Sequence, residues 1–256
     1  MSSLPSDDRG WFQLVLGNQP PLWELYTKAC GGEVLREGDV HAAIVPASPN
    51  RSFFNSVFYE DTGRLVDALP RLAEAYDAAG VNAWTVWIPA EDEGARSALA
   101  EAGHVLDATP RAMAIELSGL RLPDPDPELE IRMDMDMELL RVINETAYGF
   151  PEGDFPPMTE MPDTAGYLAS LNGTTVGTTL AWDRGEDVEI TFVATLPEAR
   201  GRGIAGRLLG HALERERNRG KSASTLVATK LGYPVYEKLG YQYVGGLEMW
   251  ERRKPA

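Results

Sequence analysis

Arginine and glycine alternate in the segment 200–205, whose sequence is Arg-Gly-Arg-Gly-Ile-Ala. Glycine lets a ligand come close to the backbone, and the first turn of a helix offers amides that have no intrahelical acceptor. Such a loop binds anions, and a pyrophosphate is its natural ligand. Arg200 and Arg202 stand where the helix dipole disfavours cations, so we interpret them as partners of a bound anion.

The elements that position this loop can be predicted from hydrophobic spacing. Residues 188–195 are rich in β-branched side chains with apolar residues at alternate places, which predicts a strand. From Gly203 to about Gly220, apolar residues recur at helical spacing and predict an amphipathic helix. Residues 222–229 predict a second strand. The loop therefore joins a strand to a helix, as an anion site requires.

The elements predicted after residue 229 are shorter than the preceding strands and helix. Residues 232–239 predict a helix with Pro234 in its first turn, and Gly240 ends it. Residues 241–244 and 247–252 predict two strands, joined in a hairpin by the glycine pair between them.

The same glycines also match G-x-G-x-x-G, the dinucleotide pattern of a Rossmann unit. Two features argue against this alternative. The acid expected at the end of the next strand is absent, because that strand closes on Ala228, Thr229 and Lys230. The approach through residues 197–200 is also longer than the tight turn of that pattern. A Walker loop is excluded because no Gly-Lys-Ser/Thr follows.

The segment 120–129 alternates proline with acidic residues, which suits neither a helix nor a central strand. We interpret it as a linker between a domain at 8–119 and a domain at 130–256. The first domain repeats the order of the second: strand 52–59, helix 64–79, strand 81–88 and helix 93–102. Glycines that end helices also repeat, as Gly80 and Gly103 in one half and Gly220 and Gly240 in the other. An ancient duplication explains this order.

Composition narrows the class of protein. The formal net charge of −15 disfavours nucleic acid and favours neutral or cationic partners, although acidity also serves solubility. A single cysteine, Cys30, and three scattered histidines predict no internal disulfide and no metal site. The first ten residues lack a secretory signal and no apolar run is long enough to cross a bilayer, so we expect a cytoplasmic protein without a membrane segment.

Two segments in the right order resemble the GNAT superfamily. Residues 193–205 match its R/Q-x-x-G-x-G/A loop, and residues 236–241 match its Y-x-x-L-G-F-like helix end. The resemblance covers most of residues 130–256. It implies an α+β fold in which two tandem GNAT-like domains each have a mixed, mostly antiparallel twisted sheet flanked by helices. It also implies acetyl-CoA as co-substrate and N-acetyl transfer as the reaction.

The resemblance assigns roles to particular residues. The backbone of the strand Val193, Ala194 and Thr195 is expected to pair with the pantetheine arm. The residues expected to hold the pyrophosphate are Arg200, Gly201, Arg202, Gly203, Ile204 and Ala205. Thr229 stands where the family has an asparagine that contacts the cofactor. Tyr236 resembles the family's acid, and Glu189 lies where some relatives have a base.

Reference pKa values limit both catalytic roles. A tyrosine near pKa ~10 cannot fully protonate a thiolate near ~8.5 without cost, so hydrogen bonding from Tyr236 to the sulfur is the safer role. A carboxylate near pKa ~4.3 is a weak base for an alkylammonium near ~10.4, so Glu189 needs burial or a water relay. The alternatives are a core tyrosine and a solvated strand glutamate. Amides near Val193 and Ala194 are expected to polarise the thioester carbonyl.

The N-terminal half serves as an internal control. Aligning Gly80 with Gly220 places Glu60, Asp61, Thr62 and Gly63 where the arginine loop lies, and Leu99 falls at the position of Tyr236. We therefore expect a degenerate domain without a cofactor loop, which shapes the substrate site or mimics a dimer partner.

The acceptor can be predicted only by class. Residues 123–163 hold twelve acids and two bases, which favours a cationic amine on a small molecule or a peptide, although a solvated acidic face is the alternative. A CoA-binding pseudoenzyme or regulatory module is the rival to an enzyme. The sequence is compatible with a monomer or a homodimer.

Overall fold

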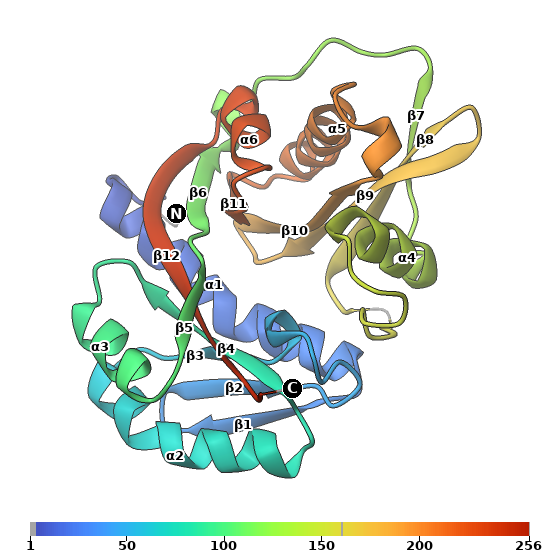
Figure 1. Cartoon of the computed structure of the whole chain (residues 1–256). Coiled ribbons are helices and arrows are strands. Elements are labelled where there is room, and N and C mark those ends of the chain that lie inside the picture. The colour runs from blue at the N-terminus through green and yellow to red at the C-terminus, as the bar shows by residue number, and fades with distance from the viewer. Residues whose placement is uncertain (1–3, 160, 256) are drawn as a thin grey trace. The chain divides into compact units, whose positions relative to one another are not determined.

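The computed structural model of the protein describes residues 4–159 and 161–255 (Figure 1). The prediction that the first ten residues are not a secretory signal includes residues 1–3, which lie outside the described residues. The twelve acids counted in residues 123–163 include Glu160, which also lies outside them. No helix of the described ranges is long and apolar enough to cross a membrane. The α-helices are α1 (Asp8–Ala29), α2 (Thr62–Ala78), α3 (Glu93–Glu101), α4 (Met137–Tyr148), α5 (Ile204–Asn218) and α6 (Tyr233–Leu239).

Contacts divide the chain into two compact units. The C-unit contains the chain up to Val15, Arg111–Phe155 and residues 161–244, and the N-unit contains Leu16–Pro110, Pro156–Thr159 and the chain from Gly245. This division differs from the one predicted from the sequence, which places a linker at 120–129 between domains at 8–119 and 130–256. The expected linker lies within the C-unit, where Arg121 N–H donates to the Leu239 carbonyl at 2.9 Å.

The sheet of the C-unit has the strand order β6-β11-β10-β9-β8-β7. Its strands are β6 (Arg111–Glu116), β7 (Leu129–Met133), β8 (Thr164–Leu171), β9 (Thr174–Asp183), β10 (Asp187–Thr195) and β11 (Ala223–Ala228). Strands β10 and β11 are parallel, and the other neighbours are antiparallel. The predicted mixed, mostly antiparallel sheet is confirmed.

The N-unit repeats this pattern with the strand order β1-β2-β3-β4-β12, and β5 also pairs with β12. Its strands are β1 (Glu33–Glu37), β2 (Val40–Ile44), β3 (Ser56–Phe58), β4 (Ala83–Pro89), β5 (Val105–Ala108) and β12 (Gln242–Arg253). Here β3 and β4 are the parallel pair. Antiparallel to β4 lies β12, and antiparallel to β11 lies β6. Each unit therefore receives one strand from the other half of the sequence.

Helices α5 and α4 cover opposite faces of the C-unit sheet. The α5 side chains Leu208 and Leu209 join Val188 and Ile190 in one buried cluster. On the other face, Asn144 of α4 donates from Nδ2 to Thr178 Oγ1 of β9 at 3.0 Å. Because strand residues alternate between faces, Glu189 lies on the α4 face.

The predicted helix ends are confirmed, because Gly80, Gly103, Gly220 and Gly240 all have a positive φ that L side chains rarely adopt. The prediction of a hairpin between residues 241–244 and 247–252 is wrong. Neither glycine at 245–246 has a positive φ, so no tight hairpin turn forms, and residues 242–253 run on as the single strand β12.

The strand predicted at 52–59 is shorter than expected. Residues Ser52–Phe54 form a 3₁₀ turn, and the strand begins only at Ser56. The buried side chain of Asn55 explains the interruption, because it bonds to Val45 N–H, the Ser48 carbonyl and the Arg51 carbonyl.

Candidate functional site

Strands β10 and β11 part after a short paired segment. Their register ends at Glu189 opposite Thr225, and beyond that point β10 is paired only with β9. A bulge between Thr191 and Ala194 coincides with the positive φ of Phe192, which is 48°. Bulges commonly re-aim backbone and side-chain groups next to active sites. The end of β10 is therefore a place where a ligand can pair with backbone.

Alternation along β10 decides which backbone groups point away from β9. The Leu196 N–H donates to the Val176 carbonyl of β9 at 2.9 Å, and the Ala194 carbonyl lies against Gly177 of β9. Neighbouring residues of a strand face opposite edges. Val193 and Thr195 therefore direct their polar groups away from β9, and we call this side the β10 edge. The backbone of Ala194 does not lie on it.

The loop after β10 leads into α5 without a side-chain cap. Gly201 and Gly203 have φ values of 77° and 73°, and Gly203 is the N-cap residue. The Arg207 N–H donates to the Gly203 carbonyl at 3.2 Å. In the part of the chain that the structure describes, no acceptor is recorded for the amides of residues 201–206. The first turn of α5 thus offers a cluster of amides to an anion.

The two loop arginines already have protein partners. Arg200 donates from Nε to the Thr195 carbonyl at 3.2 Å and from Nη2 to the Ala147 carbonyl. Arg202 pairs with Glu128 at 3.3 Å, and both side chains of that pair are exposed. Arg200 therefore connects the end of α4 to the end of β10.

Tyr236 is buried in α6, and its ring packs on the backbone of Gly232. A Cβ added at Gly232 would lie 2.8 Å from Tyr236 Cε2, so only glycine fits there. Burial raises the pKa of the Tyr236 phenol, and the neighbouring Tyr148 raises it further. The phenol therefore stays protonated at neutral pH and can donate a hydrogen bond. Thr229 Oγ1 accepts the Gly232 N–H at 3.2 Å and so helps to begin this helix.

Glu189 lies at the point where β10 and β11 part, and it is only 1% exposed. The Thr225 hydroxyl of β11 donates to its carboxylate. The same hydroxyl lies 3.3 Å from Asp187 Oδ2. The alternative of a solvated strand glutamate is therefore wrong. The carboxylate is buried and held in one orientation by the Thr225 hydroxyl.

Comparison with known proteins agrees with this geometry. A model of the acetyltransferase (GNAT) family matches residues 136–241. These residues form a GNAT acetyltransferase domain. They contain β10, the arginine loop, α5, β11 and α6, and every site residue predicted from the sequence lies within them or, for Thr229, between β11 and α6.

Solved structures share the fold over nearly the whole chain. A GCN5-related N-acetyltransferase from Kribbella flavida is 17% identical, with a TM-score of 0.68 over 93% of this chain and 95% of that one. A GCN5-related N-acetyltransferase from Sphaerobacter thermophilus is 19% identical, with a TM-score of 0.61 over 85% and 78%. A tandem GNAT protein from the clavulanic acid biosynthesis pathway is 13% identical, with a TM-score of 0.59 over 87% and 82%. No curated protein sequence matches the chain.

The strand directions in the C-unit sheet exclude the Rossmann alternative. In that fold the strand before the glycine loop has parallel neighbours on both sides. Here β10 is antiparallel to β9, and β11 is antiparallel to β6. The G-x-G-x-x-G match is therefore a coincidence of spacing.

Two residues at this site, Tyr148 and Thr225, were not predicted from the sequence. The Tyr148 hydroxyl donates to the Val193 carbonyl at 3.3 Å. No sequence signal connects the last residue of α4 to β10, because the two are 45 positions apart. Thr225, which holds Glu189, was missed for the same reason.

Several acidic residues of the segment 123–163 form ion pairs or helix caps within the protein. Arg141 pairs with Glu138 at 2.7 Å and with Glu145 at 3.0 Å. Asp136 caps α4 by accepting the Leu139 N–H. No group of three or more potential metal ligands lies together among the described residues.

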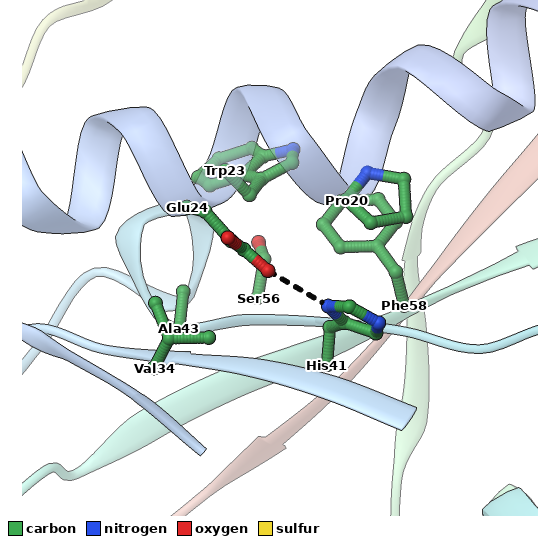
Figure 2. Close-up of a pocket in the computed structure, with 8 residues that line it drawn as sticks. All are labelled: Pro20, Trp23, Glu24, Val34, His41, Ala43, Ser56 and Phe58. Atoms are coloured by element: carbon green, nitrogen blue, oxygen red, sulfur yellow. Dashed lines mark hydrogen bonds and ion pairs between the residues drawn. The ribbon is translucent and has the colours of Figure 1, made fainter. Parts of the chain in front are cut away.

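The N-unit has a small hollow of its own, between α1 and the strands β1 to β3 (Figure 2). Glu24 and His41 point toward one another across it, with Glu24 Oε1 3.0 Å from His41 Nδ1. Arg36 compensates the Glu24 charge at 2.6 Å and contributes to lowering its pKa against the effect of burial. The cavity volume is about 10 Å³, which is room for one water molecule. We interpret it as a satisfied ion cluster beneath a helix.

Proposed function

We propose that the protein is an acetyl-CoA-dependent N-acetyltransferase with one active site, in the C-unit. The observation that carries this proposal is the juxtaposition of two features in consecutive elements. The β10 edge offers strand backbone to a pantetheine arm, and the α5 N-terminus that follows offers uncapped amides to a pyrophosphate. Thr195 Oγ1 at the end of β10 is buried and has no hydrogen-bond partner among the described residues, which also suits a polar ligand.

We assign the co-substrate contacts accordingly. Val193 and Thr195 are proposed to pair with pantetheine, while Ala194 faces β9 and leaves that set. The pyrophosphate is proposed to bind the loop formed by Arg200, Gly201, Arg202, Gly203, Ile204 and Ala205. Thr229, whose hydroxyl accepts the Gly232 N–H before α6, is proposed as a further contact of the co-substrate. The bound thioester supplies an activated acyl group.

The reaction proposed is direct transfer to a primary amine. The neutral amine nitrogen attacks the thioester carbonyl carbon, the carbon–sulfur bond breaks, and the amine loses a proton. The Val193 amide stabilises the oxyanion, and the Tyr236 hydroxyl donates a hydrogen bond to the departing sulfur. Glu189, held by Thr225, is the candidate that receives the amine proton, directly or through water.

The acceptor proposed is a cationic amine, either a small molecule or a peptide. The support is the excess of acids in the segment that includes α4. Several of these acids are already paired, so the excess of charge near the site is smaller than the residue count suggests.

A panel of amines with acetyl-CoA, scored by release of free thiol, tests the activity. Turnover on at least one primary amine is expected. Tight CoA binding without turnover on any amine would favour a CoA-binding pseudoenzyme or regulatory module. A melting assay adds a check of the cofactor: CoA should raise the melting temperature, and NAD should not.

A further inference from the structure

Tyr148, the last residue of α4, reaches the β10 edge. Its hydroxyl donates to the Val193 carbonyl at 3.3 Å, and its ring stacks on Phe150 with centroids 5.8 Å apart. The preceding residue, Ala147, accepts the Arg200 guanidinium through its carbonyl. The end of α4 is thus attached to β10 and to the arginine loop by two neighbouring residues.

The Val193 carbonyl is a group that an added ligand needs. It belongs to the β10 edge, and β11 no longer pairs with β10 at this position. A pantetheine arm carries two amide groups, and an arm that runs along this edge as an added strand donates an N–H to such a carbonyl. The Tyr148 phenol already supplies a donor to this carbonyl.

We propose that Tyr148 competes with the pantetheine arm of acyl-CoA for the Val193 carbonyl and thereby sets the affinity of the domain for its co-substrate. The proposal rests on the proposed function of this same site. Binding replaces the hydrogen bond of Tyr148 with one from the ligand, so the protein loses one interaction for each one it gains. Tyr148 is 46% exposed, so part of its side chain borders solvent, while burial around the hydroxyl raises the pKa of the phenol.

Competition and a purely structural role predict different effects on CoA affinity when the Tyr148 hydroxyl is removed. A net intramolecular hydrogen bond of ordinary strength corresponds to roughly threefold to fivefold in an equilibrium constant. Removing the Tyr148 hydroxyl therefore strengthens CoA binding by about that factor. A residue that only stabilised the fold would instead lower the melting temperature and leave affinity unchanged or weaker.

The test is Tyr148→Phe in the full chain, because phenylalanine keeps the ring stacked on Phe150 and removes only the hydroxyl. The matched control is Tyr243→Phe, since Tyr243 is 48% exposed and lies outside the site. Calorimetric titration with CoA should give a Kd three to five times lower for Tyr148→Phe and an unchanged Kd for the control. The KM for acetyl-CoA should fall while kcat stays constant.

An unchanged or higher Kd for Tyr148→Phe, or equal shifts in both variants, overturns the proposal. A wild-type chain that binds no CoA would contradict the proposed function first, and the competition with it. These results are distinguishable because the wild-type titration is read before either variant.

Discussion

Helices α5 and α2 begin at matching places in the two units, each directly after the strand that pairs in parallel with the next one, but their first turns have opposite chemistry. In α5 the N-cap is Gly203, with no side-chain cap and two arginines before it. In α2 the N-cap is Asp61, whose carboxylate accepts the Arg64 N–H at 3.0 Å. Helix α5 has no side-chain cap at its N-terminus, whereas the Asp61 carboxylate caps α2.

A second carboxylate reinforces the contrast in the N-unit. Asp92, which caps α3, accepts the Tyr59 and Thr62 hydroxyls, each at 2.7 Å. Its charge and these bonds fill the region next to the start of α2. The comparison teaches that the shared frame of strand, helix and strand does not by itself make an anion site. The chemistry of the first helical turn decides it.

Arg200→Glu gives the largest expected effect on this comparison. The change removes the guanidinium held by the Thr195 and Ala147 carbonyls and adds a negative charge to the loop, so CoA affinity should fall roughly 100-fold, the size of one charge-assisted contact. Calorimetric titration measures it, with melting temperature as the check on folding. Glu60→Ala, at the matching place before α2, should leave CoA affinity unchanged. Equal losses in both variants would contradict a single site in the C-unit.

Tyr236→Phe sharpens the comparison at α6, because the aligned residue of the N-terminal half is Leu99, a buried apolar side chain. Loss of the hydrogen bond to sulfur should lower kcat roughly 10- to 100-fold with a smaller change in the KM for acetyl-CoA. Burial raises the pKa of Tyr236, so wild-type kcat should show no decline from its ionisation below about pH 10. A Tyr236→Phe enzyme with full kcat would remove the residue from the mechanism.

The buried His104 of the N-unit is expected to affect the pH dependence of folding stability and not ligand binding. It is buried in the N-unit with no hydrogen-bond partner among the described residues for either ring nitrogen. Burial and, next, repulsion from Arg252 lower its pKa to about 4. The unfolded chain, with a histidine pKa of about 6.5, then binds more protons, so stability falls as the pH drops from about 6.5 toward 4.

The expected loss attributable to His104 is about 2 kcal/mol between pH 7 and pH 5, from the linkage of these two pKa values. Urea unfolding at both pH values measures it, and His104→Leu should remove most of that difference. If the variant keeps the full pH dependence, another group is responsible.

Asp61→Ala has the smallest expected effect. Removing the α2 N-cap should lower the free energy of unfolding by about 1 kcal/mol and leave CoA affinity unchanged. Chemical denaturation and CoA titration of the same variant check both halves of the prediction. New CoA binding by the N-unit would show that Asp61 alone blocked an otherwise intact site.

The sequence by itself determined the local elements of this protein. The strand, loop and helix around Gly203, and the positive φ of Gly220 and Gly240, follow from spacing and from the freedom of glycine, which are properties of a few neighbouring residues. The arginine loop and Tyr236 could be predicted as site residues from sequence alone, since each belongs to a short motif.

The tertiary structure alone decided which distant segments meet. The exchange of β6 and β12 between units, the burial of Glu189 and the contact of Tyr148 with Val193 all join residues far apart in the chain. Periodicity reports which face of an element is apolar, but it carries no information about which partner covers that face. The choice of partner depends on packing and hydrogen bonding over the whole fold. The exchange of β6 and β12 and the contact of Tyr148 with the β10 edge could therefore be found only from the tertiary structure.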